Sequence, residues 1–347
     1  GKTVVLANDV DFEPKVLTPV GNVRKELQGK KTVYINVPFS GIFDGQNHAL
    51  RNILFDNEKA TYDEINVALF GCIENAEIKD LTVSGSIKSD IQYSLVGGVV
   101  GAAKGGAVLS GIVSNVDLTG DARAHAGGVV GSSQGPDGLL TIERCVYAGT
   151  IDLPNTTDCI GGIIGYANEN VTIRDCGFVG TLKRSEADGG YRGGILGYVN
   201  NAYFGGLTGC FSAGTVEPPA EGHSESNGAL IGRLNSRTNR SKIGGNCYSE
   251  GTTAVGTVNS TTGAFGDLWP IADWTSGEAA WLLNSKRTDG TVLWYQEAGA
   301  DPYPTFDGGR GQVYRSNEYD GNGFWRNYIY GNSGSDAAYS AYEPAVK

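Results

Sequence analysis

The chain has 347 residues, 53 of them glycine, no methionine and a formal net charge of −11. A hydrophobic content of 40% is too high for a disordered chain, and the absence of a Lys/Arg run disfavours nucleic acid or an anionic membrane as a partner. No run of about 18 apolar residues occurs, so we expect no membrane insertion. The chain opens directly in strand-like residues, so we expect either a mature fragment or a truncated piece of a longer protein. Its acidity fits an extracellular or surface protein.

Residues 1–66 precede the clear repeat and are expected to form N-terminal lead-in and capping coils. Val4–Leu6 has strand character, and Asn8–Phe12 is predicted to be a polar turn. Phe39–Gly45 is predicted to be a short strand that ends in an Asp-Gly turn. The polar residues 56–66 are expected to form a surface loop.

From residue 67 to residue 252 the chain repeats a glycine motif, Gly-Gly-[Val/Ile]-[Val/Ile/Leu]-Gly. Its closing glycines are 30 to 35 residues apart, and self-similarity at such an interval predicts stacked repeats. We expect the paired glycines to let the backbone turn into a packed strand, with the apolar pair in the core. The four full copies are Gly97–Gly101, Gly127–Gly131, Gly161–Gly165 and Gly193–Gly197, followed by the degraded copy Gly228–Gly232 and preceded by the related segment Val67–Gly71.

A second strand follows each motif, and its residues align from coil to coil. Parallel stacking at about 4.8 Å would place equivalent side chains in one inward column. We expect the cysteines in this column to be free, buried thiols, because side chains in register suit disulfide geometry poorly. No C-x-x-C spacing occurs, so neither a metal site nor a cofactor is predicted. The column comprises Leu81, Ile112, Cys145, Cys176, Cys210 and Cys247.

Four positions after this column, a glycine recurs in most coils. Its recurrence indicates a backbone corner that a Cβ atom would strain. These corner glycines are Gly85, Gly149, Gly180, Gly214 and Gly251.

Residues 253–310 change character and are predicted to form a Trp-rich C-terminal cap. Such a cap would cover the open end of a stack of strands. Thr275–Glu278 fits a capping box, so a short helix is expected to begin before Ala279–Leu283. Residues 311–347, rich in Tyr, Asn and Gly, are expected to be a tail or the start of a linker. The tryptophans of the cap are Trp269, Trp274, Trp281 and Trp294.

These motifs resemble the GLUG-repeat proteins of bacterial cell surfaces. The resemblance covers roughly residues 1–310 and implies a right-handed parallel β-helix, or β-solenoid, without catalytic residues. Such repeats occur in secreted or wall-attached proteins, including regions beside the catalytic domain of some immunoglobulin-A-cleaving metalloproteases. Besides the glycine motif, the matching segments are Cys145–Thr150, Cys210–Thr215, Asn8–Phe12, Gly41–Gly45, Ala68–Gly71, Ala280–Asn284, Trp294 and Tyr303–Pro304.

Signals for catalysis are weak. Gly131–Gly135 matches the G-x-S-x-G pattern near His125, but that motif requires a strand-to-helix turn. Asp44 and His48 could form a carboxylate–imidazole pair, against which stands a purely structural Asp-Gly turn. A polysaccharide-active β-helix would need paired acids at coil corners, where solvated loops are the plainer interpretation. The charged residues available there are Glu169, Asp175, Glu186, Asp188, Arg184 and Arg192.

Aromatic residues offer a stronger signal for binding. Tyr166 and Tyr198 each follow a glycine motif directly and should stack on adjacent coils, with Tyr191, Tyr203 and Arg192 nearby. Flat rings at coil spacing could receive sugar rings by apolar stacking. The alternative is a structural aromatic ladder.

The sequence therefore favours a non-catalytic extracellular stalk or adhesion module of a bacterial surface protein, which binds a glycan or a host protein along a rigid face. One alternative is a β-helical polysaccharide lyase or glycoside hydrolase. Another is a structural spacer beside a protease domain in a larger chain.

Overall fold

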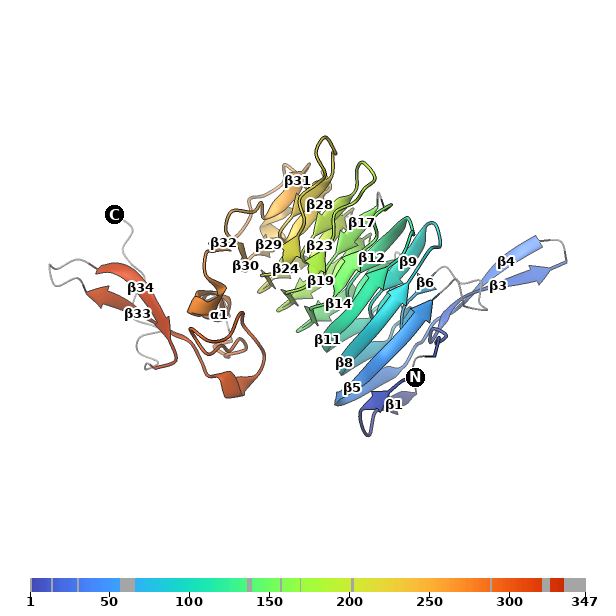
Figure 1. Cartoon of the computed structure of the whole chain (residues 1–347), viewed down its shortest axis with the longest axis horizontal. Coiled ribbons are helices and arrows are strands. Elements are labelled where there is room, and N and C mark those ends of the chain that lie inside the picture. Colours follow the sequence, from blue (N-terminus) through green and yellow to red (C-terminus); the bar gives the residue numbers. More distant parts are fainter. Residues whose placement is uncertain are drawn as a thin grey trace.

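The computed structural model describes residues 2–13, 15–29, 31–56, 66–135, 139–156, 158–168, 170–200, 203–287, 289–319 and 325–333. They form a parallel β-solenoid in which each coil stacks on the one before it (Figure 1). The predicted all-β parallel β-helix, with a short helix near its C-terminal end, is confirmed. We call each stacked layer a rung. Most of the surface loop predicted at 56–66 lies outside the described residues.

Three sheets run along the solenoid, and their strands pair in parallel from rung to rung. The long sheet contains β1 (Thr3–Val5), β2 (Val10–Asp11), β5 (Ile42–Asp56), β8 (Glu77–Lys88), β11 (Val108–Thr119), β14 (Leu139–Glu143), β15 (Val146–Tyr147), β16 (Thr150–Asp152), β19 (Asn170–Arg174), β20 (Gly177–Phe178), β21 (Thr181–Leu182), β24 (Gly206–Thr208), β25 (Phe211–Ser212), β26 (Thr215–Val216), β29 (Ile243–Gly244), β30 (Asn246–Ser249) and β32 (Leu268–Ile271). The second sheet contains β7 (Phe70–Glu74), β10 (Val100–Lys104), β13 (Val130–Ser133), β18 (Ile164–Ala167), β23 (Leu196–Val199), β28 (Ile231–Leu234) and β31 (Val255–Val258). The third contains β6 (Asn66–Val67), β9 (Ser94–Gly97), β12 (Ala124–Gly127), β17 (Cys159–Gly161), β22 (Tyr191–Gly193) and β27 (Ser226–Gly228).

The remaining elements lie outside these sheets. They are the antiparallel hairpins β3 (Asn22–Gln28) with β4 (Lys31–Val37) and β33 (Tyr314–Tyr319) with β34 (Trp325–Gly331), the helix α1 (Glu278–Ser285), and the 3-10 turns Arg240–Lys242, Trp274–Ser276 and Gly308–Arg310.

The glycine motif joins the third sheet to the second, and close approach explains its composition. Gly127 lies in register with Gly97 and Gly161 on the neighbouring rungs. A Cβ atom on Gly128 would overlap the Tyr147 ring and the carbonyl oxygen of Gly162. A Cβ atom on Gly131 would lie 2.7 Å from the carbonyl oxygen of the preceding rung's Gly101, closer than real Cβ contacts allow. The motif therefore excludes side chains because rungs pack too tightly, not because its backbone is left-handed.

The inward column of the long sheet follows the predicted order through three cysteines. Cys145 stacks over Ile112, and Cys176 and Cys210 follow in register. All six cysteines of the chain are free and buried, which fits the thiols predicted for this column.

Cys247 does not belong to the column, so this part of the prediction is wrong. Asn246 lies over Cys210, while Cys247 pairs with the outward-facing Phe211. Cys247 follows Ile243 by four positions, whereas Cys210 follows Leu207 by three. Ile243 is in register with Leu207 and the ladder continues without a bulge, so Cys247 lies one position beyond Cys210. Asn246 replaces the thiol with two hydrogen bonds: its Oδ1 accepts from the Cys210 N–H at 2.9 Å and its Nδ2 donates to the Leu207 carbonyl at 2.9 Å.

Three further local predictions need correction. β5 runs through the predicted Asp-Gly turn, because Gln46 and Asn47 adopt φ of 51° and 61° and absorb a register shift within the strand. The predicted polar turn at Asn8–Phe12 contains the short strand β2. Of the corner glycines, Gly251 leaves its column: it adopts φ of 78°, and no atom lies within 4 Å of a Cβ built there.

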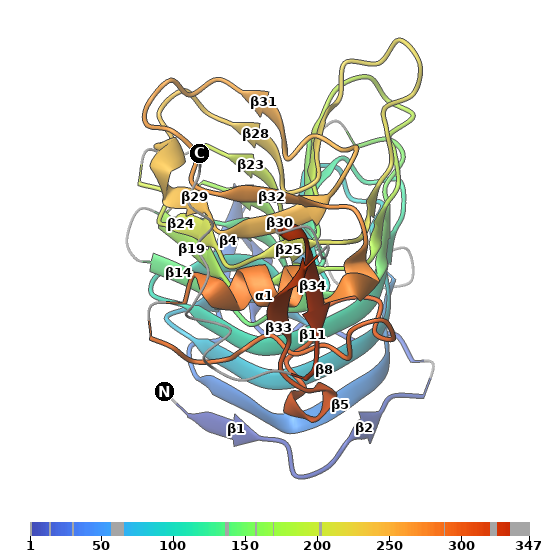
Figure 2. The same ribbon diagram turned by 90° about the vertical axis from the view of Figure 1, so that its left-hand side faces the viewer.

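The cap region adds a strand to the last rung of the long sheet and also packs against the outer face of that sheet. β32 pairs with β30, and α1 then lies against the long sheet (Figure 2). Phe211, whose side chain points away from the core, is buried beneath Trp294, with ring centroids 5.2 Å apart. The predicted capping box is wrong. Asp273 caps the preceding 3-10 turn, and the left-handed Gly277 precedes α1 without a side-chain cap.

A pair of glycine substitutions tests the packing of the motif. Gly128→Ala is expected to destabilise the protein by about 1–3 kcal/mol or more, because its methyl group must displace the buried Tyr147 ring or separate two rungs. Gly106→Ala is the matched control, since its nearest neighbouring atom would be 3.7 Å from the new Cβ and its φ is ordinary. We expect the control to change the free energy of unfolding by less than about 1 kcal/mol, as measured by urea denaturation. Equal effects of the two substitutions would contradict the packing argument.

Candidate functional site

The predicted aromatic row exists, but its rings lie against one another. Tyr166 on β18 and Tyr198 on β23 are in register, with ring centroids 5.6 Å apart. His125 stacks on Tyr166 at 4.5 Å, and Tyr191 lies 5.0 Å from Tyr198. The guanidinium of Arg233 covers the row at 4.7 Å from the Tyr191 ring. Ring faces that a sugar would need are therefore used within the protein.

The hydroxyl groups of this row are also satisfied internally, by an asparagine ladder. Tyr166 donates to Asn168 Oδ1 at 3.2 Å, and Tyr198 donates to Asn200 Oδ1 at 3.1 Å. The Asn200 amide donates to the Tyr166 hydroxyl at 2.7 Å, and Asn235 donates to the Asn200 amide oxygen at 2.6 Å. This network supports the structural-ladder alternative. A binding role for Tyr166, Tyr198 and Tyr191 stays a prediction.

The other two residues predicted to bind ligand differ sharply in exposure. Tyr203 is 75% exposed and lies outside the row. Arg192 is 0% exposed, because its position continues the inward column of Ile160. Its guanidinium pairs with the buried Glu225 carboxylate, and its Nε donates to the Lys183 carbonyl at 3.0 Å. Arg192 therefore cannot contact a ligand at the surface of this structure.

Burial acts on both members of this ion pair. It raises the pKa of the Glu225 carboxyl, which the Arg192 charge partly offsets, and it lowers the pKa of the Arg192 guanidinium. The Ser185 N–H donates to Glu225 Oε1 at 3.0 Å, so the pair also fixes the loops that carry Ser185 and Glu225.

Replacing one member of the Arg192–Glu225 pair should lower the free energy of unfolding more than replacing both. Arg192→Met alone is expected to cost about 3–5 kcal/mol, because it leaves Glu225 buried without a counter-charge. The double variant Arg192→Met/Glu225→Leu should recover part of that loss. Urea denaturation of both single variants and the double variant gives the coupling energy. Single-variant costs below about 1 kcal/mol that simply add would show that the pair does not stabilise the fold.

The two catalytic motifs do not form catalytic arrangements. Ser133 lies within strand β13 rather than at a strand-to-helix turn, and its hydroxyl accepts from the Asn168 N–H at 3.1 Å. His48 Nδ1 lies 3.1 Å from Asp9 rather than beside Asp44. The Ala49 N–H, Arg51 and His48 together lower the pKa of Asp9 to about 2, so this cluster fastens the first rung.

The acidic residues predicted at coil corners separate in space. Asp188 accepts from the Ser224 N–H at 2.6 Å, which lowers the pKa of Asp188 in a surface loop. Asp175 instead faces the cap. Glu169 lies outside the described residues. Among the described acidic residues of this set, Asp175 lines the cleft described next.

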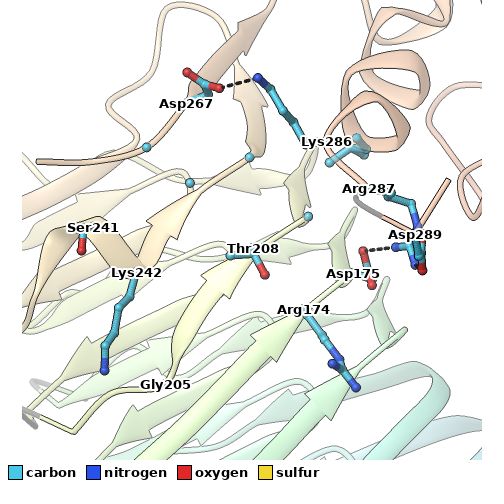
Figure 3. Close-up of a pocket in the computed structure, with 15 residues that line it drawn as sticks. Arg174, Asp175, Gly205, Thr208, Ser241, Lys242, Asp267, Lys286, Arg287 and Asp289 are labelled. Carbon is cyan, nitrogen blue, oxygen red and sulfur yellow. Dashed lines mark hydrogen bonds and ion pairs between the residues drawn. The ribbon is translucent and has the colours of Figure 1, made fainter. Parts of the chain in front are cut away.

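That cleft lies between the outer face of the long sheet and the cap, and has a volume of about 590 Å³ (Figure 3). Two ion pairs close its cap side: Arg287 with Asp175 at 3.0 Å, and Lys286 with Asp267 at 3.0 Å. Glycines leave much of its floor as bare backbone. Its lining comprises Arg174, Asp175, Gly205, Thr208, Gly209, Ser241, Lys242, Gly244, Gly245, Gly266, Asp267, Leu283, Lys286, Arg287 and Asp289.

Some charged side chains of the cleft pair with a group of opposite charge, and Lys242 does not pair with a carboxylate of the described residues. Burial raises the pKa of Asp175, and the Arg287 charge opposes that shift. Arg174 bonds through Nε to Glu143 on the adjacent rung at 2.6 Å. Lys242 Nζ donates to the Phe204 carbonyl at 2.7 Å and has no carboxylate partner in the part of the chain that the structure describes. The cleft thus offers charged donors and acceptors around an open floor.

Sequence reasoning found Asp175 but missed the residues that complete the cleft. Lys242, Lys286 and Arg287 follow no motif, and the Asp175–Arg287 contact joins residues 112 positions apart. The Trp-rich composition of residues 253–310 was the one signal, and it indicated a cap without indicating which face the cap would cover.

Comparison with known proteins leaves the family open. No protein-family model matches the chain, and no curated protein matches it. Membership of the GLUG-repeat family therefore stays a prediction. The chain shows a distant likeness to the crystal structure of a Bacteroides ovatus protein to which immunoglobulin A1 protease activity has been ascribed. The identity is 17% and the TM-score 0.39, over 88% of this chain and 85% of that chain. This likeness is too distant to assign a function.

Two other kinds of site are absent from the described residues. No three His, Cys, Asp or Glu side chains within the described ranges gather as a metal ion would require. None of the helices that the structure describes has the length and apolar character needed to span a bilayer.

Proposed function

We propose that this chain is a non-catalytic extracellular module of a bacterial surface protein, a stiff stalk that binds glycan in the cleft beneath its cap. The observation that carries the proposal is the cleft itself, about 590 Å³ lined by charged and hydroxyl side chains over a glycine floor. Sugar hydroxyls need donors and acceptors in fixed positions. The continuous ladder of rungs supports a stalk role, because it holds the cleft on an extended, rigid body.

The cleft favours glycan binding over the aromatic row. Thr208 is exposed on the outer face and lines the cleft, with Lys242 and Arg174 on the same sheet side (Figure 3). The rings of Tyr166 and Tyr198 already pack within the protein. Binding in the cleft would use the exposed Thr208 hydroxyl and the ammonium hydrogens of Lys242 other than the one donated to the Phe204 carbonyl.

A screen on a glycan array, followed by calorimetry with the best ligand, tests this. Lys242→Gln removes the positive charge and keeps a polar side chain, and Thr208→Val keeps the shape but loses the hydroxyl. Each is expected to weaken binding about tenfold. Tyr203→Ala, which removes the exposed ring, should leave the affinity unchanged. Loss of binding in Tyr203→Ala with no loss in the cleft variants would refute the proposed site.

One observation favours a polysaccharide-active enzyme as the second candidate. A carboxyl whose pKa is raised by burial, as in Asp175, is the kind of group that serves as a general acid. Incubation with a polysaccharide panel, assayed for new reducing or unsaturated ends, separates the two functions. Turnover would replace the stalk proposal with an enzyme. No binding on the glycan array and no cleavage of the polysaccharide panel would favour a spacer beside a further domain.

A further inference from the structure

The last complete coil is followed by one that skips two strands. Residues 213–230 connect β25 to β28 and include β26 and β27. In the next coil, residues 250–254 alone connect β30 to β31, so the chain passes directly from the long sheet to the second sheet. The shortcut begins in a turn, where Thr252 Oγ1 donates to the Ser249 carbonyl at 2.5 Å. No described strand therefore pairs with the far edge of β26 or β27.

Backbone groups of β26 point into this vacant position. The N–H groups of Thr215 and Glu217 donate back to the previous rung, to Gly180 at 2.9 Å and to Leu182 at 3.0 Å. Since neighbouring residues of a strand alternate in direction, the N–H and C=O of Val216 face the opposite way, toward the missing rung. The edge is a template for one more parallel strand.

The inward column beneath the vacancy is aliphatic and ends abruptly. Ile87, Leu118, Ile151, Leu182 and Val216 stack in register. The first four are fully buried, whereas the last is only partly buried. An added aliphatic side chain would complete the cover over Val216.

The vacancy is a slot of about 320 Å³ without a charged side chain, although the chain carries a net charge of −11. Asn227 lines the slot, and the amide Oδ1 of Asn227 is buried without a hydrogen-bond donor in the described residues. An uncharged partner matches such a lining. The slot is formed by Gly214, Val216, Pro218, Pro219, Asn227, Gly228, Ala229, Ser249, Gly251, Thr252 and Thr253.

We propose that this slot binds an extended, uncharged peptide segment of a partner protein, which adds to β26 as a parallel rung. The partner segment carries the pattern that the rungs below share, glycine, threonine and an aliphatic residue, seen in Gly149–Ile151, Gly180–Leu182 and Gly214–Val216. Main-chain hydrogen bonds to β26 hold the segment, and the aliphatic side chain covers Val216. The partner segment needs glycine at its first position for the same reason as Gly214. A Cβ atom on Gly214 would lie only 2.5 Å from the Gly180 carbonyl oxygen of the previous rung.

A blocked peptide with the sequence of residues 212–216, Ser-Ala-Gly-Thr-Val, is the probe. Saturation-transfer difference NMR with the whole chain should show transfer to the valine methyl groups. Val216→Pro removes the N–H that faces the slot while leaving the bonds of Thr215 and Glu217 to the previous rung. It is expected to reduce the transfer about tenfold. Val216→Thr, which keeps the N–H and the branched shape, should retain it within about twofold.

A change in the peptide provides an independent arm, which decides the matter if Val216→Pro does not fold by circular dichroism. By the pattern of Thr181 and Thr215, the threonine N–H of the added strand donates to the rung below. N-methylation of that threonine should abolish the transfer. Absence of transfer from the unmodified peptide, or equal transfer from the N-methylated one, would overturn the proposal.

Discussion

The structure depends on how closely successive rungs approach at the glycine motif. Gly128 donates its N–H to the Gly161 carbonyl of the next rung at 3.1 Å, and Gly162 does the same to Gly193 at 3.1 Å. A methyl group at these positions has no room. The Tyr147 ring fills the space that Gly128 leaves open, and the Tyr147 hydroxyl donates to the Val116 carbonyl at 3.0 Å.

Regular stacking also determines where function can lie. A repeat that continues unchanged uses its polar groups on itself, as the tyrosine and asparagine rows do. Groups become available where the repeat stops. Both proposed sites lie at such positions: the cleft forms where the cap turns back onto the outer face, and the slot forms where a coil omits two strands. The two sites differ in chemistry, one charged and one uncharged, so they would serve different ligands.

Much of the fold was predictable because a repeated sequence repeats one environment. The motif spacing predicted the coils, and the order Cys145, Cys176, Cys210 predicted an inward column. Prediction failed where a single residue changes the environment. One extra residue turns Cys247 outward, and the pattern of the sequence does not show whether a bulge or a shift will absorb it. Arg192 is polar, yet it occupies an aliphatic column because Glu225 reaches it from a distant loop.

The candidate site was less predictable than the fold, for a physical reason. Contacts between rungs occur at a fixed separation that the sequence displays, whereas contacts between the cap and the solenoid have no period. The pairing of Asp175 with Arg287 arises from the path of the cap alone. The same holds for the burial of Phe211 beneath Trp294.

Amide hydrogen exchange tests the central claim most directly. If tight stacking at the glycine motif holds the solenoid together, the N–H groups of Gly128 and Gly162 in the middle rungs should exchange only through unfolding of the stack. Their protection should be equal, and the slowest in the protein. Exchange of these two amides as fast as that of the loop at residues 217–225 would contradict the account, because it would show that the rungs separate locally at the motif.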